Sequence, residues 1–175
     1  IEDINGTLDD ILSLARVGRP SDPLERTDLA ALAASVVDDY EDMGEDVTLE
    51  IAGRPALPLR ATWLKRALRN LIGNALRYGA RARVRVDLTE HEAVVAIEDD
   101  GPGIPEVDLA AMLEPFVRGE ASRNRGTGGA GLGLTLARAI AQQHGGVLVL
   151  TNRGGGESGA IAGLRAELRL PFQSR

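Results

Sequence analysis

The sequence has no cysteine, and aromatic side chains make up only 3% of its 175 residues. Without cysteine, the chain can form neither a disulfide nor a thiolate metal site. So few aromatic residues leave little surface for stacking nucleic-acid bases, and a net charge of -6 lacks the basic excess typical of duplex binding. We therefore expect no nucleic-acid partner, and any anionic ligand would need a local binding site.

Long hydrophobic runs are missing as well. No segment approaches the roughly 18 apolar residues that a membrane-spanning helix needs, and no basic-then-apolar signal segment opens the chain. We expect contact with a membrane only through segments that this sequence does not include. The sequence does contain 43% hydrophobic residues, which is enough for one globular domain with a substantial aliphatic core.

The first part of the chain predicts a helix followed by a linker. Apolar residues recur at spacings of three and four from Ile1 through Leu8 to Ala15, the pattern of an amphipathic helix that packs against partner helices. Gly18 and Pro20 then end the helical pattern. The predicted division is a helical stub at 1–19, a linker at 20–26 and a folded domain at 27–173.

Within the folded domain, the apolar pattern predicts helices over 28–42, 62–78 and 132–144, and a short one near 107–113. We expect Asp28 to cap the first helix, Thr62 or its neighbour to cap the second, and Gly79 to end it. The expected strands are 47–51, 56–60, 84–88, 94–98, 147–151 and 160–170. Because hairpins dominate, the predicted fold class is α/β (α+β): a two-layer sandwich whose mixed, mainly antiparallel sheet is covered on one face by helices.

The second predicted helix carries the first cluster of polar residues. Arg66, Asn70 and Asn74 follow one another at four-residue spacing, and Arg77 and Tyr78 lie at the same end. An amide oxygen is a suitable ligand for Mg²⁺ beside phosphate oxygens, and Arg77 could pair with phosphate charge. A solvated helix face would show the same pattern, so this cluster alone leaves both interpretations open.

The second cluster follows a predicted strand directly, at Asp99 to Ile104. Gly101 and Gly103 allow the backbone to turn sharply and approach a ligand closely. A buried Asp99 could accept a hydrogen bond from an exocyclic amine while a planar base lies against the glycines. A plain turn would also use this sequence.

The third cluster is the glycine-rich run from Gly126 to Leu134, which leads into a helix. Free N–H groups at a helix N-terminus can bind phosphate, and Arg118, Arg123 and Arg125 add local positive charge. No Gly-Lys-Ser/Thr follows, which excludes a P-loop. A flexible linker is the alternative.

The order of four sequence boxes resembles that of sensor histidine kinases of two-component systems, osmosensors in particular. Residues 70–78 resemble their N box, 99–105 their G1 box, 114–119 their F box and 129–134 their G2 box. The resemblance covers residues 24 to 172. It implies the GHKL-type ATP-binding fold, which these kinases share with heat-shock chaperones, type II topoisomerases and mismatch-repair ATPases.

By this resemblance Asn74 would hold Mg²⁺, Asn70 would lie near the phosphates, and Asp99 would bind the adenine amino group. Asn70, Asn74 and Arg77 are the expected catalytic residues, and the loop at 117–130 is the expected ATP lid. Ala130 stands where many members have Thr, which removes a hydroxyl but keeps the backbone donors. The full set of residues expected to contact ATP is Asn70, Asn74, Arg77, Tyr78, Asp99, Gly101, Gly103, Ile104, Phe116, Arg118, Gly129, Ala130, Gly131, Leu132, Gly133 and Leu134.

Asn70 also distinguishes kinases from the hydrolytic relatives, which resemble this chain but carry a Glu at that position as base. An amide cannot take a proton at neutral pH, so phosphotransfer is favoured over efficient hydrolysis. A second hypothesis remains: a nucleotide-sensing or protein-binding module that has kept the fold and lost phosphotransfer.

Neither histidine fits the expected phosphoacceptor. His91 lies in a predicted hairpin turn and His144 at a helix end before two glycines. The resemblance therefore implies an acceptor on a dimerisation helix upstream, with residues 1–17 as the end of the second such helix. It further implies a homodimer, a response regulator as partner, and a cytoplasmic domain of a protein in the bacterial inner membrane.

Overall fold

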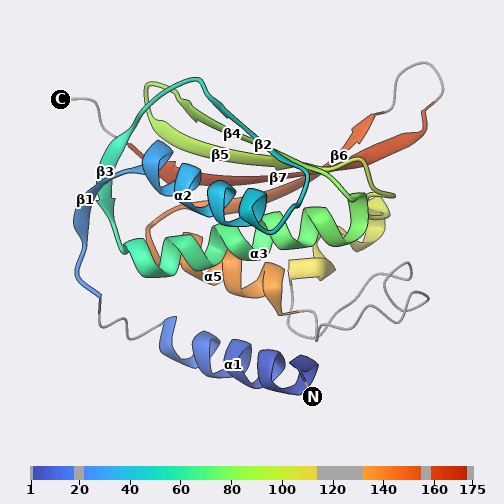
Figure 1. Cartoon of the computed structure of the whole chain (residues 1–175), viewed down its shortest axis with the longest axis horizontal. Helices are drawn as coiled ribbons and strands as arrows, with labels where there is room; N and C mark the ends of the chain where they lie inside the picture. Colours follow the sequence, from blue (N-terminus) through green and yellow to red (C-terminus); the bar gives the residue numbers. More distant parts are fainter. Residues whose placement is uncertain (1, 18–21, 114–131, 155–158, 173–175) are drawn as a thin grey trace.

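The computed structural model describes residues 2–17, 22–113, 132–154 and 159–172. One β-sheet carries three helices on one of its faces, and a fourth helix, α1 (Glu2–Val17), lies beyond them on the side away from the sheet (Figure 1). The predicted two-layer arrangement is therefore confirmed, and residues 2–17 form a helix.

The main sheet has five strands in the order β2 (Val47–Ile51), β4 (Ala82–Leu88), β5 (Glu92–Glu98), β7 (Ile161–Pro171) and β6 (Val147–Gly154). Strands β2 and β4 run parallel, and all other neighbours are antiparallel. This confirms a mixed, mainly antiparallel sheet. A separate two-stranded sheet joins β1 (Glu25–Asp28) to β3 (Ala56–Leu59).

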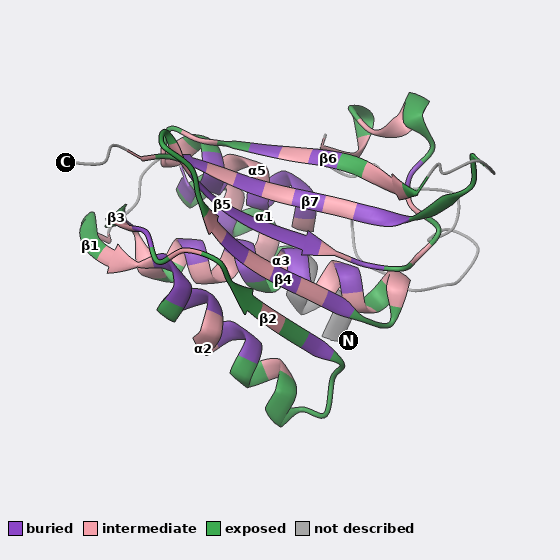
Figure 2. Cartoon of the chain, turned by 90° about the horizontal axis from the view of Figure 1, so that it is seen from above, coloured by how far each residue is buried: buried purple, intermediate pink, exposed green. Residues whose placement is uncertain are grey.

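Three helices bury their apolar faces on the sheet: α2 (Leu29–Asp42), α3 (Ala61–Gly79) and α5 (Gly133–Gln143). Buried positions recur along these helices and alternate along β4 and β7, so the core lies between the two layers (Figure 2). Asp28 caps α2 as expected, because its side chain accepts a hydrogen bond from the Ala31 N–H at 3.1 Å.

Helix α1 contacts α5, and its buried side carries Ser13 and Val17. Leu8, Ile11 and Leu12 are exposed, whereas Ser13 and Val17 are buried. The described apolar residues of the expected stripe, Leu8 and Ile11, therefore lie on the exposed side of α1, and their packing against partner helices stays a prediction. In the described part of the chain, no helix is both long and apolar enough to cross a membrane.

Several predicted boundaries were wrong in detail. The linker expected at 20–26 overlaps β1, whose largely exposed Glu-Arg-Thr-Asp sequence has no apolar alternation to reveal a strand. The N-cap of α3 is Arg60 and not Thr62 or its neighbour, and no side chain caps this end. The short helix expected near 107–113 is two 3₁₀ turns, η1 (Glu106–Asp108) and η2 (Ala111–Leu113).

The end of α3 also differs from the prediction. Gly79 is still helical, and the residue in the left-handed conformation is Ala80, with a φ of 61°. A Cβ at Gly79 would lie 2.6 Å from the Asp99 Cβ. Glycine is therefore needed at position 79 for close packing against the following loop rather than for a left-handed cap.

Candidate functional site

The structure brings the first and third clusters together through α3 and α5. Leu64, Leu68 and Ile72 of α3 are buried in the core, which leaves Asn70 and Asn74 half-buried on another side of the helix. The Asn70 side-chain amide donates a hydrogen bond to the Gly133 carbonyl at 3.4 Å. Helix α5 therefore begins beside the amide face of α3.

The side chains at the N-terminus of α5 are turned into the protein. Leu132 and Leu134 are both buried, and Leu134 belongs to the main core. No side chain caps the helix at Leu132. Free N–H groups there could face an anion, while the two leucine side chains anchor the helix start.

The second cluster is built around a buried carboxylate. Asp99 is only 4% exposed, and its Oδ1 accepts hydrogen bonds from the N–H groups of Gly101 at 2.9 Å and Leu164 at 3.3 Å. Burial raises the pKa of Asp99, although both hydrogen bonds and the nearby Arg153 guanidinium oppose the rise. The sequence-predicted Asp99 is thus held in a defined orientation by main-chain donors.

Close glycine contacts join the Asp99 loop to the end of α3. A Cβ at Gly101 would lie 2.6 Å from the Tyr78 carbonyl oxygen, just as one at Gly79 would collide with Asp99. On the other side of the loop, a Cβ at Gly163 of β7 would lie 1.9 Å from the Asp99 carbonyl oxygen. Backbones therefore approach here at distances that only glycine permits.

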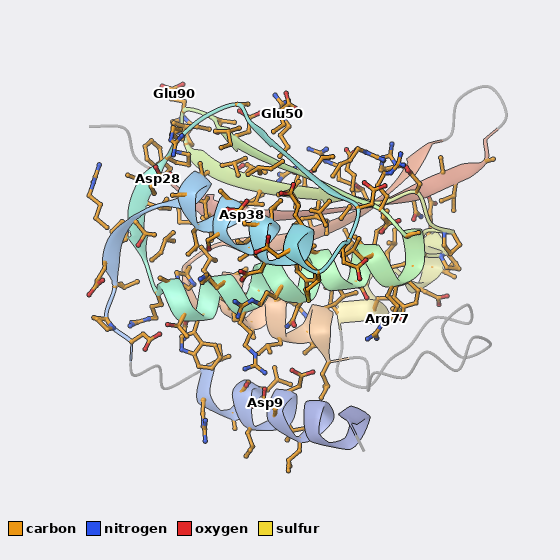
Figure 3. All side chains as sticks on the ribbon, viewed as in Figure 1. Asp9, Asp28, Asp38, Glu50, Arg77 and Glu90 are labelled. Carbon is orange, nitrogen blue, oxygen red and sulfur yellow. The ribbon has the colours of Figure 1, made fainter. Side chains whose placement is uncertain are left out.

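Arg77 and Tyr78 lie at the C-terminal end of α3, next to this loop. Arg77 is exposed and extends on the side of α3 away from the sheet, whereas Tyr78 is half-buried (Figure 3). Arg66 belongs elsewhere, because its guanidinium pairs with Asp9 and Asp10 of α1 at 2.5 and 3.1 Å. Of the three residues at four-residue spacing, Arg66 therefore joins α3 to α1 and does not belong to the candidate site.

Asp100 differs from Asp99 in its exposure, its partners and the direction of its pKa shift. Its carboxylate is exposed and pairs with the guanidinium groups of Arg83 and Arg153. Hydrogen bonds from Arg83 and then Arg153 hold the pKa of Asp100 well below its usual range. Asp99 is thus buried on main-chain donors, while Asp100 belongs to a network of exposed charges with Arg83 and Arg153.

Two residues that the sequence did not single out support the site. Asn152 of β6 bonds to both main-chain groups of the buried Ile104, and the Thr135 hydroxyl of α5 donates to the Leu113 carbonyl at 2.8 Å. Asn152 follows Leu148 and Leu150 at two-residue spacing. A polar residue in that inward-facing position is the signal that could have identified it.

Part of the predicted site lies outside the described residues: Phe116, Arg118, Gly129, Ala130, Gly131 and the loop expected at 117–130. In the ranges that are described, no three His, Cys, Asp or Glu side chains gather where they could hold a metal ion.

The two histidines stand as the sequence suggested. His91 is exposed in the hairpin between β4 and β5. His144 is half-buried at the end of α5, where its Nε2 accepts from the Arg60 N–H at 3.0 Å and its Nδ1 bonds to the Ile140 carbonyl at 2.8 Å. Burial lowers the pKa of His144, so this ring is a neutral link between α5 and α3.

Residues 60–174 match the family described as histidine kinase-, DNA gyrase B-, and HSP90-like ATPase. The sensor histidine kinase GtrS of Pseudomonas aeruginosa is 41% identical over 150 residues, which are 85% of this chain and 29% of that kinase. The chain thus spans less than a third of this relative.

Solved structures show the same fold. The histidine kinase domain of the Escherichia coli osmosensor EnvZ is 30% identical, with a TM-score of 0.65 over 90% of this chain and 94% of that one. The histidine kinase ShkA, whose full-length structure is a complex with AMPPNP, is 21% identical and has a TM-score of 0.75. That match covers 97% of this chain and 36% of ShkA, and at this identity it shows the fold alone.

Proposed function

The chain belongs to the family of histidine kinase-, DNA gyrase B-, and HSP90-like ATPases, and from this premise we propose that it binds ATP with Mg²⁺ for phosphorylation of a histidine. The observation that carries the proposal is that α3 contacts both the Asp99 loop and the described end of the glycine-rich run. Asn70 meets Gly133 across α3 and α5, and the end of α3 packs on the Asp99 loop.

The base would bind at the Asp99 loop. The carboxylate already has two main-chain donors on Oδ1, which fix its orientation, and it could accept a further hydrogen bond from the adenine amino group. Gly101 and Gly103 let the loop backbone pack directly against Tyr78 and Asn152, which keeps the Asp99 loop in place. AMPPNP, an ATP analogue, is bound in the ShkA complex, whose chain has this fold.

The phosphates would lie between α3 and the start of α5. The free N–H groups at Gly133 and the Arg77 guanidinium would face the anionic charge. The Asn74 amide oxygen would be one ligand of Mg²⁺, with phosphate oxygens and water as the others. Mg²⁺, when bound, neutralises part of the phosphate charge.

Transfer rather than hydrolysis follows from the side chain at position 70. Asn70 donates to Gly133 and has no basic group that could activate water at neutral pH. The γ-phosphoryl group would therefore pass to a histidine on a dimerisation domain of the same protein, and then to a response regulator. The whole protein would be a homodimer at the bacterial inner membrane, with this domain in the cytoplasm.

Isothermal titration with ATP and Mg²⁺ tests the binding. We expect the wild-type chain to bind, and Asp99→Ala to bind at least about tenfold more weakly, since it loses the acceptor for the base. Asp38→Asn is the matched control, because Asp38 is an exposed carboxylate on α2 (Figure 3) and its loss should leave affinity unchanged. Absence of wild-type binding, or equal binding by Asp99→Ala, contradicts the proposal.

A longer chain that includes the dimerisation helices tests the transfer. We expect incubation with ATP to produce acid-labile phosphate on a histidine. If ATP binds but no such phosphate forms, the chain is a nucleotide-sensing module that has lost transfer.

A further inference from the structure

Asn152 holds a residue that lies 48 positions earlier in the chain. Its Oδ1 accepts from the Ile104 N–H at 2.9 Å, and its Nδ2 donates to the Ile104 carbonyl at 2.5 Å. An amide is suited to this double contact because it can donate and accept at the same time. One side chain thus takes both main-chain groups of the residue at the end of the Asp99 loop.

The loop has few ways to hold this shape by itself. Pro102 and Pro105 carry no N–H group, and the Gly101 N–H is already bonded to Asp99. The Ile104 N–H is therefore one of the few donors left, and Asn152 accepts it.

Contact with the β6–β7 hairpin continues at Gly103, which has a φ of 68°. A Cβ there would lie 2.5 Å from the Ile161 Cγ2 and 2.6 Å from the Asn152 Oδ1. The loop backbone therefore rests directly on the hairpin.

The same hairpin fixes the other end of the loop. The Asp99 N–H donates to the Leu164 carbonyl at 3.0 Å, and the Arg153 guanidinium donates to the Asp99 carbonyl at 2.7 Å. Leu164 pairs with Asn152 across the two strands. Three neighbouring hairpin residues thus set the distance between the Asp99 carboxylate and Ile104.

We propose that Asn152 is a positioning residue for the nucleotide base: it fixes the loop at 99–104 so that Asp99 and the loop backbone meet the base together. This inference rests on the proposed ATP binding. Asn152 contacts the main chain of the loop and acts on the ligand only through it. The residues proposed for the phosphates, Asn74 and Gly133, belong to α3 and α5, so loss of Asn152 should weaken recognition of the base and spare the phosphates.

Asn152→Ala tests this role, with the exposed neighbour Thr151→Ala as matched control. We expect Asn152→Ala to lower the affinity for ATP with Mg²⁺ about tenfold, because a loop without these two hydrogen bonds would hold the binding shape in only about a tenth of the molecules. The preference for ATP over GTP should fall by a similar factor. Competition by inorganic tripolyphosphate with Mg²⁺ should stay at the wild-type level, and the Ile104 amide should exchange faster with solvent. Thr151→Ala should match the wild type in all four measurements.

Each other outcome has a distinct meaning. If the wild type binds ATP and Asn152→Ala keeps its affinity and base preference, the positioning role is overturned. Equal losses for ATP and tripolyphosphate, or the same losses in Thr151→Ala, overturn it too, because they indicate general damage to the hairpin. If the wild type binds no ATP, the proposed function fails and this inference fails with it.

Discussion

Replacing Asp99 with Asn separates the structural role of this carboxylate from its proposed role in binding. The side-chain oxygen of Asn can still accept from the Gly101 and Leu164 N–H groups, which lie 2.9 and 3.3 Å from Oδ1. The change removes a buried charge, which favours folding, and weakens two charge-assisted hydrogen bonds, which opposes it. We therefore expect Asp99→Asn to change the free energy of unfolding by less than about 1 kcal/mol.

Asp99→Ala is the contrasting variant because it leaves both N–H groups without their acceptor. Each buried donor left unsatisfied costs about 1 to 3 kcal/mol, so for two donors we expect a loss of about 2 to 6 kcal/mol in denaturant unfolding. ATP affinity should differ less between Asp99→Asn and Asp99→Ala than stability does. In Asp99→Asn the NH₂ group would replace the second carboxylate oxygen and oppose the adenine amino group, so ATP affinity should fall at least about tenfold.

The pH dependence follows from the raised pKa of Asp99. Because the folded state favours the neutral carboxyl, wild-type stability should fall relative to Asp99→Asn as the pH rises above 3.8 and through the raised pKa. Urea unfolding across this pH range measures the stability difference, and titration calorimetry measures the ATP affinity of the two proteins. Wild-type ATP affinity in Asp99→Asn would refute the amine contact, and destabilisation equal to that of Asp99→Ala would refute the role assigned to its hydrogen bonds.

Asn74→Ala should reduce ATP affinity about tenfold with Mg²⁺ and leave it unchanged with a chelator, as titration calorimetry can show; equal losses in both conditions would argue against a metal ligand. Because burial lowers the pKa of His144, its contribution to stability is complete above pH 6.5 and declines as the pH falls through the lowered pKa. His144→Gln should therefore lose less of its melting temperature than the wild type between about pH 7.5 and about 5.5. Ala80→Gly should raise the free energy of unfolding by about 0.5 to 1 kcal/mol by relieving the left-handed φ of 61°. Gly79→Ala should lower the free energy of unfolding by about 1 to 3 kcal/mol, because its Cβ would meet Asp99. Urea unfolding measures the change in both variants, and a Gly79→Ala variant as stable as the wild type would contradict the close packing.

Much of the fold could be predicted because its signals are local. Alternating apolar residues identified β4, β5 and β7, and three- and four-residue spacing identified α2, α3 and α5. Asp28 was recognisable as a cap from its position alone. β1 was missed because a short strand of mainly exposed polar residues has no such period.

The sequence predicted which types of residue make up the candidate site better than it predicted which residue has which role. Asn70, Asn74 and Asp99 were assigned through the order of the boxes that resemble histidine kinases, because each cluster alone also fits a solvated helix face or a plain turn. Arg66 shared their spacing, yet it pairs with α1. Asn152 was missed: its place after two inward-facing leucines was a local signal, but its partner Ile104 is set only by tertiary packing.

The sequence by itself determined the periodicities, the order of the elements and the chemistry of three clusters, because backbone geometry imposes these within a few residues. Only the tertiary structure decided that Asn70 meets Gly133 across 63 positions, that Leu164 donates to Asp99 across 65, and that Asn152 holds Ile104. It also decided which face of α1 is buried and why position 79 is glycine. Such contacts depend on how whole elements pack, and packing combines residues whose separation along the chain carries no periodic signal.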